Sequence, residues 1–180
     1  IACFAEAAPA ELICAPTARP IAHAGKIAAT RNLIKTGGTL HSLVIFAKFA
    51  DEAAHLQAPP SYADTLFDPH TPGSLAHFYG TMSFHQFSLA GTVLPRRYHS
   101  DNPASYYVSS TQGQGHFGRF VEEVLAQVDR DIDFGEFDND GPDGVPNSGD
   151  DDGWVDYVFI VPRSAPRGFI VGGATGVAGL

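Results

Sequence analysis

The chain has 180 residues, and its 44% of hydrophobic and 17% of charged residues favour a globular fold with a buried core over a disordered chain. No apolar run approaches the roughly 20 residues that a membrane-spanning helix needs, so we expect no membrane span. The nearest approach to a basic patch is the pair Arg96 and Arg97, which is too small to neutralise a phosphate backbone and argues against nucleic-acid binding.

The first 40 residues are rich in Ala and Pro, and we expect them to form an irregular leader. The apolar run Leu43–Ala47 is short, continuous and partly β-branched, which is typical of a strand buried on both faces. After a segment dense in turn residues, Ser74 is placed to cap a helix over residues 75–82. Apolar residues recur there at helical spacing, which predicts a buried face made of Leu75, Phe78, Tyr79 and Met82.

The second half of the chain continues the alternation of strands and helices. Alternating apolar residues predict a strand over residues 84–93, and residues 117–128 return to helical spacing. Between them, the polar stretch 98–115 is predicted to be a long loop that carries Tyr106 and Tyr107.

A last strand is predicted over residues 155–161, and residues 166–180 form a Gly/Ala-rich tail. The order strand, helix, strand, helix, strand predicts an α/β fold, with a mixed sheet and two main helices.

The two cysteines, Cys3 and Cys14, lie close together in the leader. A disulfide between them would close a short loop and contribute about 2 to 3 kcal/mol, enough to fix a terminus rather than a fold. Two separate thiols are the alternative interpretation.

Half of the acidic residues fall within one short segment. Ten of the twenty Asp and Glu residues lie between Asp131 and Asp156, where there is no Lys or Arg. Carboxylates at this density repel one another unless a cation neutralises them, and the glycines in the segment allow the tight turns that bring oxygens together. Oxygen ligands in irregular geometry suit Ca²⁺ better than Mg²⁺ or Zn²⁺. The segment therefore predicts a calcium-binding loop.

This acidic segment is not an EF-hand, because Pro142 occupies a ligand position and Gly149 stands where the bidentate Glu would be. Asp150 and Asp151 are expected to be solvated neighbours of the ion. A solvated acidic loop without any ion is the alternative. The predicted calcium ligands are Asp138, Asp140, Asp152 and Asp156.

Several segments occur in a recognisable order between residues 40 and 165. They are Leu43–Asp51, Leu66–Asp68, Gly73–Tyr79, Met82–Gly91, the Asp133-Phe134 pair, the Asp138-Asn139-Asp140-Gly141 motif and Val155–Val161. Their combination resembles the immune-inhibitor-A-like family of secreted zinc metallopeptidases.

The resemblance implies that residues 41–165 are the front part of a zincin-like metalloendopeptidase domain, secreted, with Ca²⁺ in the acidic loop and a protein or peptide as substrate. Such enzymes bind zinc through a His-Glu-x-x-His helix. None of the eight His here is followed by Glu, and no two are four residues apart. Zn²⁺ is therefore expected only with a catalytic segment further along, no catalytic residue is assigned, and these 180 residues alone should be inactive.

The missing zinc motif leaves a second hypothesis, a non-catalytic, calcium-stabilised structural module that self-assembles outside the cell as a filament or surface layer. The eight His are scattered, so we expect ordinary surface residues rather than metal ligands, with His77 and His85 flanking the predicted helix. Trp154 is expected to pack the acidic segment onto the last strand.

Overall fold

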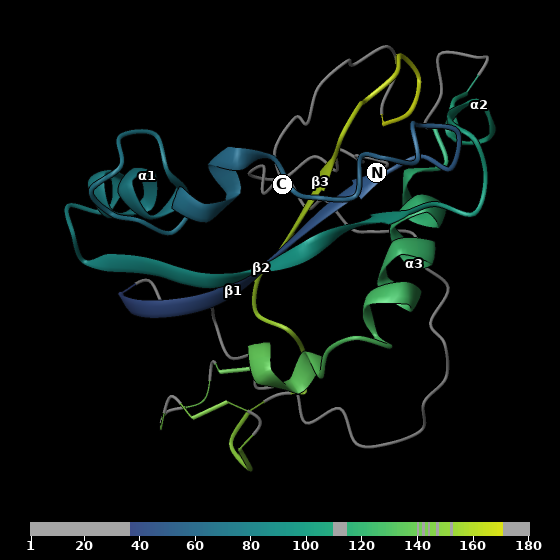
Figure 1. Cartoon of the computed structure of the whole chain (residues 1–180). Helices are drawn as coiled ribbons and strands as arrows, with labels where there is room; N and C mark the ends of the chain where they lie inside the picture. Colours follow the sequence, from purple (N-terminus) through teal and green to yellow (C-terminus); the bar gives the residue numbers. More distant parts are fainter. Residues whose placement is uncertain are drawn as a thin grey trace, which may run out of the picture. The chain divides into compact units, whose positions relative to one another are not determined.

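Three parallel strands form a sheet in the structure, a computed structural model of the chain (Figure 1). The structure describes residues 37–109, 115–139, 141, 143, 145–146, 148–151 and 153–170, all within the compact unit Arg31–Leu180. Cys3 and Cys14, the leader up to residue 36 and the tail from residue 171 lie outside the described residues.

The central strand is β1, Gly38–Lys48, which pairs with β2, Phe87–His99, on one side and with β3, Val158–Pro162, on the other. Both pairings are parallel, so in the described part of the chain the expected mixed sheet is wrong. Every residue of β1 from Ser42 to Lys48 is buried, as the continuous apolar run predicts for a strand covered on both faces.

The register between β1 and β2 shifts once along the pair. Val44 pairs with Val93, and the next paired residue of β1, Phe46, meets Arg97. The shift falls around Pro95, which has no backbone N–H to donate to the neighbouring strand. Proline is tolerated at such an irregularity because β2 lies at the edge of the sheet.

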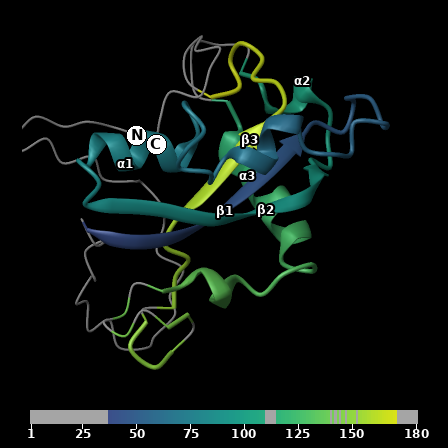
Figure 2. The same ribbon diagram turned by 60° about the vertical axis from the view of Figure 1, so that its left-hand side comes forward.

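Helices cover both faces of the sheet (Figures 1 and 2). The chain leaves β1 through the 3-10 helix η1, Ser61–Thr65, and the helix α1, Leu75–Met82, and it leaves β2 through α2, Ala104–Tyr107, and α3, Phe117–Val128. Parallel crossovers share one handedness, and the two crossovers run in opposite directions along the sheet, so they place their helices on opposite faces.

Two apolar clusters follow from this arrangement. The cluster on the η1 and α1 side is small, and its buried members are Val44, Phe46 and Ala63. The cluster on the α3 side is the main core, and its buried members are Leu43, Ile45, Ala47, Phe49, Leu94, Tyr98, Tyr107, Phe120, Val124, Val128, Phe137 and Phe169. Phe169 lies at the centre of this core, with its ring 5.0 Å from that of Phe49 and 5.2 Å from that of Phe120.

The helix 75–82 forms as predicted, and the Ser74 side chain accepts a hydrogen bond of 3.0 Å from the amide of His77. Its predicted buried face is right for two of the four residues, because Leu75 packs against the cluster of Val44, Phe46 and Ala63, and the hydroxyl of Tyr79 lies 3.0 Å from that of Tyr157. The other two residues are exposed. Phe78 and Met82 are 54% and 65% exposed, because the eight-residue helix rests on the sheet through the small residue Ala76 instead.

The region between β2 and α3 also differs from the expectation of a polar loop over residues 98–115. Tyr98 lies inside β2 and is buried, and Tyr107 lies in α2 and is fully buried. Their rings fill the main core while their hydroxyls reach acidic side chains, which is how tyrosine is usually buried.

Candidate functional site

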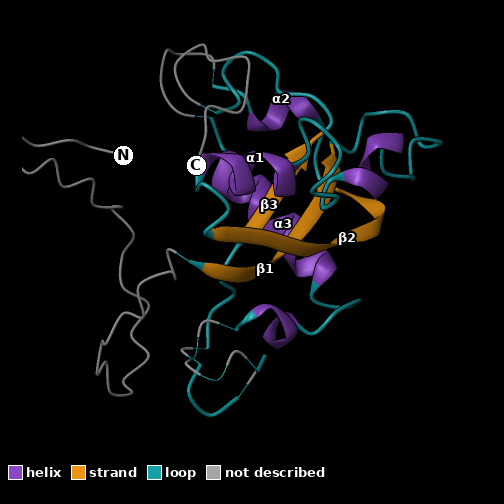
Figure 3. Ribbon diagram, turned by 90° about the vertical axis from the view of Figure 1, so that its left-hand side faces the viewer, coloured by secondary structure: helices purple, strands orange, loops and turns teal. Residues whose placement is uncertain are grey.

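The part of the acidic segment that carries the predicted calcium ligands, residues 138–156, follows a short 3-10 helix, η2, Phe134–Phe137. The carboxylate of Asp133 caps this helix and accepts a hydrogen bond of 2.9 Å from the amide of Gly135. The helix packs near the start of β1, where the rings of His41 and Phe137 are 5.7 Å apart. Figures 1 and 3 show η2 below β1, with the described part of the segment after it lower still. The segment returns to the sheet at β3.

The two ends of the acidic segment are held together by three hydrogen bonds. The amide of Asp156 donates to the carbonyl of Phe137 at 3.1 Å, and the amide of Asn139 donates to Oδ2 of Asp156 at 3.0 Å. The amide of Gly153 donates to Oδ2 of Asp138 at 2.7 Å. Asp138 is 4% exposed, so one of the two carboxylates at this junction is buried. Two of the four predicted calcium ligands, Asp138 and Asp156, are therefore brought together.

Asp150 and Asp151 were expected to be solvated neighbours; Asp150 is exposed as expected, and both side chains also accept hydrogen bonds within the segment. Asp151 is half-buried and accepts hydrogen bonds from the amides of Gly141, at 3.0 Å, and Ser148. Asp150 is exposed and accepts from the Ser148 hydroxyl and from the amide of Asp143, at 3.2 Å. The Ser148 hydroxyl, followed by the Asp143 amide, lowers the pKa of Asp150 below its ordinary value.

Glycine is required at position 141 by this folding of the segment. A Cβ atom there would lie 2.7 Å from Oδ1 of Asp151 and 2.8 Å from Oδ2 of Asp150. Both carboxylates are already fixed by backbone donors, so they could move only by giving up those hydrogen bonds. Gly141 thus allows these two carboxylates to pack closely against the backbone.

The donor set suits a hard cation, since the segment offers carboxylate and carbonyl oxygens, with no His or Cys between residues 131 and 156. Asp140 and Asp152, the other two predicted ligands, lie outside the described residues. Within the described part, no three His, Cys, Asp or Glu side chains are grouped so that they could hold a metal ion. The described residues by themselves therefore complete neither a zinc nor a calcium site.

Trp154 does not pack the segment onto β3 as expected. Its side chain is 76% exposed, and Gly153 before it has a φ of 82°. The chain's one tryptophan is therefore largely accessible to solvent near the end of the acidic segment.

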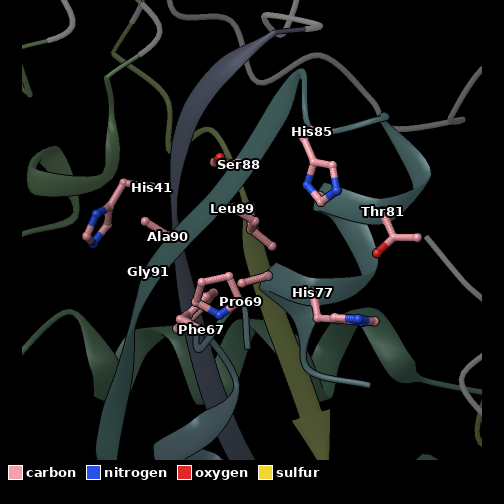
Figure 4. A pocket seen from close by; sticks show the side chains of 12 residues that line it. His41, Phe67, Pro69, His77, Thr81, His85, Ser88, Leu89, Ala90 and Gly91 are labelled. Carbon is pink, nitrogen blue, oxygen red and sulfur yellow. The ribbon is translucent and has the colours of Figure 1, made fainter. Parts of the chain in front are cut away.

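A hollow of about 570 Å³ beside α1 is lined in part by three histidines (Figure 4). His77 and His85 come from α1 and the turn after it, and His41 comes from β1. In Figure 4, His77 and His85 lie on the helix side of β2 and His41 lies on its other side, so the three rings do not converge. The spacing of residues in the sequence could not predict this hollow, because its walls come from α1 and two strands that meet only in the folded chain.

The chain matches no protein-family model, and no curated protein matches it. In the part of the chain that the structure describes, no helix is long and apolar enough to cross a membrane.

Proposed function

We propose that the chain is the front part of a secreted metalloendopeptidase domain and that its acidic segment binds a stabilising Ca²⁺. The observation that supports the calcium site is the junction of Asp138 and Asp156, which lie at opposite ends of the segment and are joined by backbone hydrogen bonds. A cation held there would neutralise a concentration of charge that otherwise opposes folding of the segment.

Calcium at this junction would stabilise the folded state and would take no part in catalysis. Asp156 is two residues before β3, so fixing the junction fixes the start of a strand that pairs with the central strand. A ligand that binds only the folded state at 100 times its Kd stabilises that state by about 2.7 kcal/mol.

The peptidase part of the proposal rests on the family resemblance of residues 40–165. Zinc, when bound in such an enzyme, polarises the peptide carbonyl and activates a water molecule. The described residues hold no group suited to zinc, so we assign them no catalytic step and propose that they support a catalytic segment elsewhere.

The exposed apolar side chains around α1 favour the second candidate, a self-assembling calcium-stabilised module. Phe78, Met82 and Phe84 are 54%, 65% and 85% exposed. Exposed apolar groups near one another mark interaction surfaces. In this case calcium would also promote oligomers, which light scattering would detect.

The test is a titration of the chelator-treated chain with Ca²⁺, with Mg²⁺ and Zn²⁺ titrated separately. Trp154 is exposed beside the segment, so its fluorescence should change with Ca²⁺, and the melting temperature should rise. Mg²⁺ should act far more weakly because it dehydrates reluctantly. Unchanged fluorescence and melting temperature at millimolar Ca²⁺ would reject the calcium site.

A further inference from the structure

The three parallel strands begin near the acidic segment, and their carboxyl ends lie at the opposite end of the sheet. In open parallel sheets, ligands bind outside these ends, between two adjacent strands whose outgoing connections pass over opposite faces of the sheet. β1 and β2 are such a pair, since η1 and α1 follow β1 on one face and α2 and α3 follow β2 on the other. A hollow of about 360 Å³ lies at the ends of these two strands, and the polar residues that line it are Lys48, Glu52, Gln57, His99, Ser100 and Asp101.

Lys48, the last residue of β1, is a buried cation in the wall of this hollow. The residue is 4% exposed, and its ammonium donates one hydrogen bond, to the carbonyl of Ala53 at 3.1 Å. An ammonium group has three donors, and across the described residues no carboxylate forms an ion pair with Lys48. The ammonium therefore makes one of its three possible hydrogen bonds among the described residues.

Two acidic residues share the hollow, but neither neutralises Lys48. Glu52 accepts hydrogen bonds from the guanidinium of Arg163 and the hydroxyl of Ser164, both at 2.8 Å, and from the amide of Phe49. Asp101 is exposed to solvent, and it forms no ion pair with any described cation. Glu52 is thus paired with Arg163 rather than with Lys48.

A second cation lies on the same face of the sheet. Lys48 pairs with His99, and Arg97 is two residues before His99 on β2, so the three side chains share a face. The Nε atom of Arg97 is buried and has no hydrogen-bond partner among the residues that the structure describes. Burying positive charge without a counter-charge costs several kcal/mol per ion, so this end of the sheet favours an anion.

We propose that the hollow at the carboxyl ends of β1 and β2 binds a small oxyanion group, a carboxylate or a phosphate, through the ammonium of Lys48. His99 lies at the mouth of the site, where its ring is exposed and its Nδ1 is 3.0 Å from the carbonyl of Ser100. The volume of about 360 Å³ is large enough for a small molecule that carries such a group.

The test is calorimetric titration of the chain with inorganic phosphate and, separately, with acetate, in a buffer without chloride. Lys48→Gln removes the charge inside the hollow, and Arg130→Gln removes an exposed charge at the end of α3 as its matched control. Ala54→Asp adds a negative charge at an exposed wall of the hollow, and Ala126→Asp adds one on the exposed side of α3.

We expect Lys48→Gln and Ala54→Asp to weaken binding at least tenfold and both controls to bind as the parent chain does. Binding of phosphate alone or of acetate alone identifies the source of the oxyanion. The proposal is overturned if the parent chain binds neither anion, or if Ala54→Asp binds as tightly as Ala126→Asp. Should Lys48→Gln fail to fold, the Ala54 and Ala126 pair decides the question by itself.

Discussion

The carboxylate of Asp156 accepts a 3.0 Å hydrogen bond from the backbone amide of Asn139, 17 residues before it, and so joins the two ends of the acidic segment. Asp156→Asn keeps the size of the side chain but removes its charge. We expect calcium affinity to fall at least tenfold, which corresponds to about 1.4 kcal/mol. Calorimetry measures the affinity, and hydrogen exchange at the Asn139 amide reports the junction.

Asp129→Asn is the matched control for this change. Asp129 is exposed at the end of α3, and its side chain forms no ion pair with a described residue. The control should bind calcium as the parent chain does. Equal affinities for the Asp156 and Asp129 variants would show that the junction is not part of the ion site.

A second prediction concerns Glu123, a buried carboxylate on α3 with three donors. The hydroxyl of Tyr107, the amide of Asp101 at 2.9 Å and Nε of Arg119 at 2.9 Å all donate to it. Glu123→Gln leaves these donors facing a neutral amide, and we expect a loss of about 2 to 4 kcal/mol in the free energy of unfolding at pH 7. Glu122→Gln, next to it but exposed, should change that free energy by less than about 0.5 kcal/mol.

The same carboxylate makes part of the stability depend on pH. Burial by itself raises the pKa of Glu123, but the donors, with Tyr107 first, outweigh burial and hold the pKa below the ordinary value of 4.5. A carboxyl whose pKa is lowered by folding stabilises the folded state above 4.5, and that stabilisation is lost as the pH falls through the lowered pKa. Urea unfolding should therefore show a smaller difference between parent and Glu123→Gln at pH 3 than at pH 7.

Local pattern was enough to predict some elements. The apolar run of β1 and the helical spacing of residues 117–128 both predict what the structure shows, and Ser74 caps α1 as expected. In each case the residues that decide the element are adjacent in the sequence, and burial on the sheet agrees with their spacing.

What the sequence could not predict depends on contacts between distant segments. Phe78 has the spacing of a core residue, but α1 is short and sits on Ala76, so Phe78 remains in solvent. Tyr107 lies in a polar stretch, yet Glu123 on α3 provides the partner that allows its burial. Likewise, the charge of the acidic segment is visible in the sequence, whereas the junction of Asp138 and Asp156 appears only in the fold.

A third prediction concerns Gly91 on β2. A Cβ atom at this position would lie 2.3 Å from Cζ of Phe67, 2.4 Å from the carbonyl oxygen of Ser42 and 2.7 Å from the Ser42 hydroxyl. The carbonyl belongs to the central strand and cannot yield, so Gly91→Ala should lower the free energy of unfolding by about 1 to 3 kcal/mol or more.

Gly118→Ala is the control for Gly91. No atom lies within 4 Å of a Cβ built at Gly118, which is exposed on α3. Gly118 is the second residue of α3, and alanine loses less backbone entropy on folding than glycine, so this variant should be at least as stable as the parent. Urea unfolding of both variants gives the comparison, and equal effects of the two changes would mean that β2 moves aside at Gly91.

The last prediction concerns the turn between α1 and β2, where Phe84 and His85 have left-handed backbone angles, with φ of 54° and 60°. Such a conformation costs roughly 1 to 2 kcal/mol for a side chain with a Cβ, and least for Asn among such residues. Phe84 is 85% exposed and has little packing to lose, so Phe84→Asn should stabilise the fold by about 0.5 to 1 kcal/mol. The measurement is the midpoint of urea unfolding.

Phe78→Asn separates backbone strain from the loss of an aromatic ring. Phe78 is also exposed, but it lies within α1, where Asn is a poor helix former, so this variant should be destabilised. Opposite signs for the two variants would locate the strain at the turn. If Phe84→Asn is destabilising as well, the ring of Phe84 stabilises the turn by more than its backbone conformation costs, and the turn is held in place by that ring.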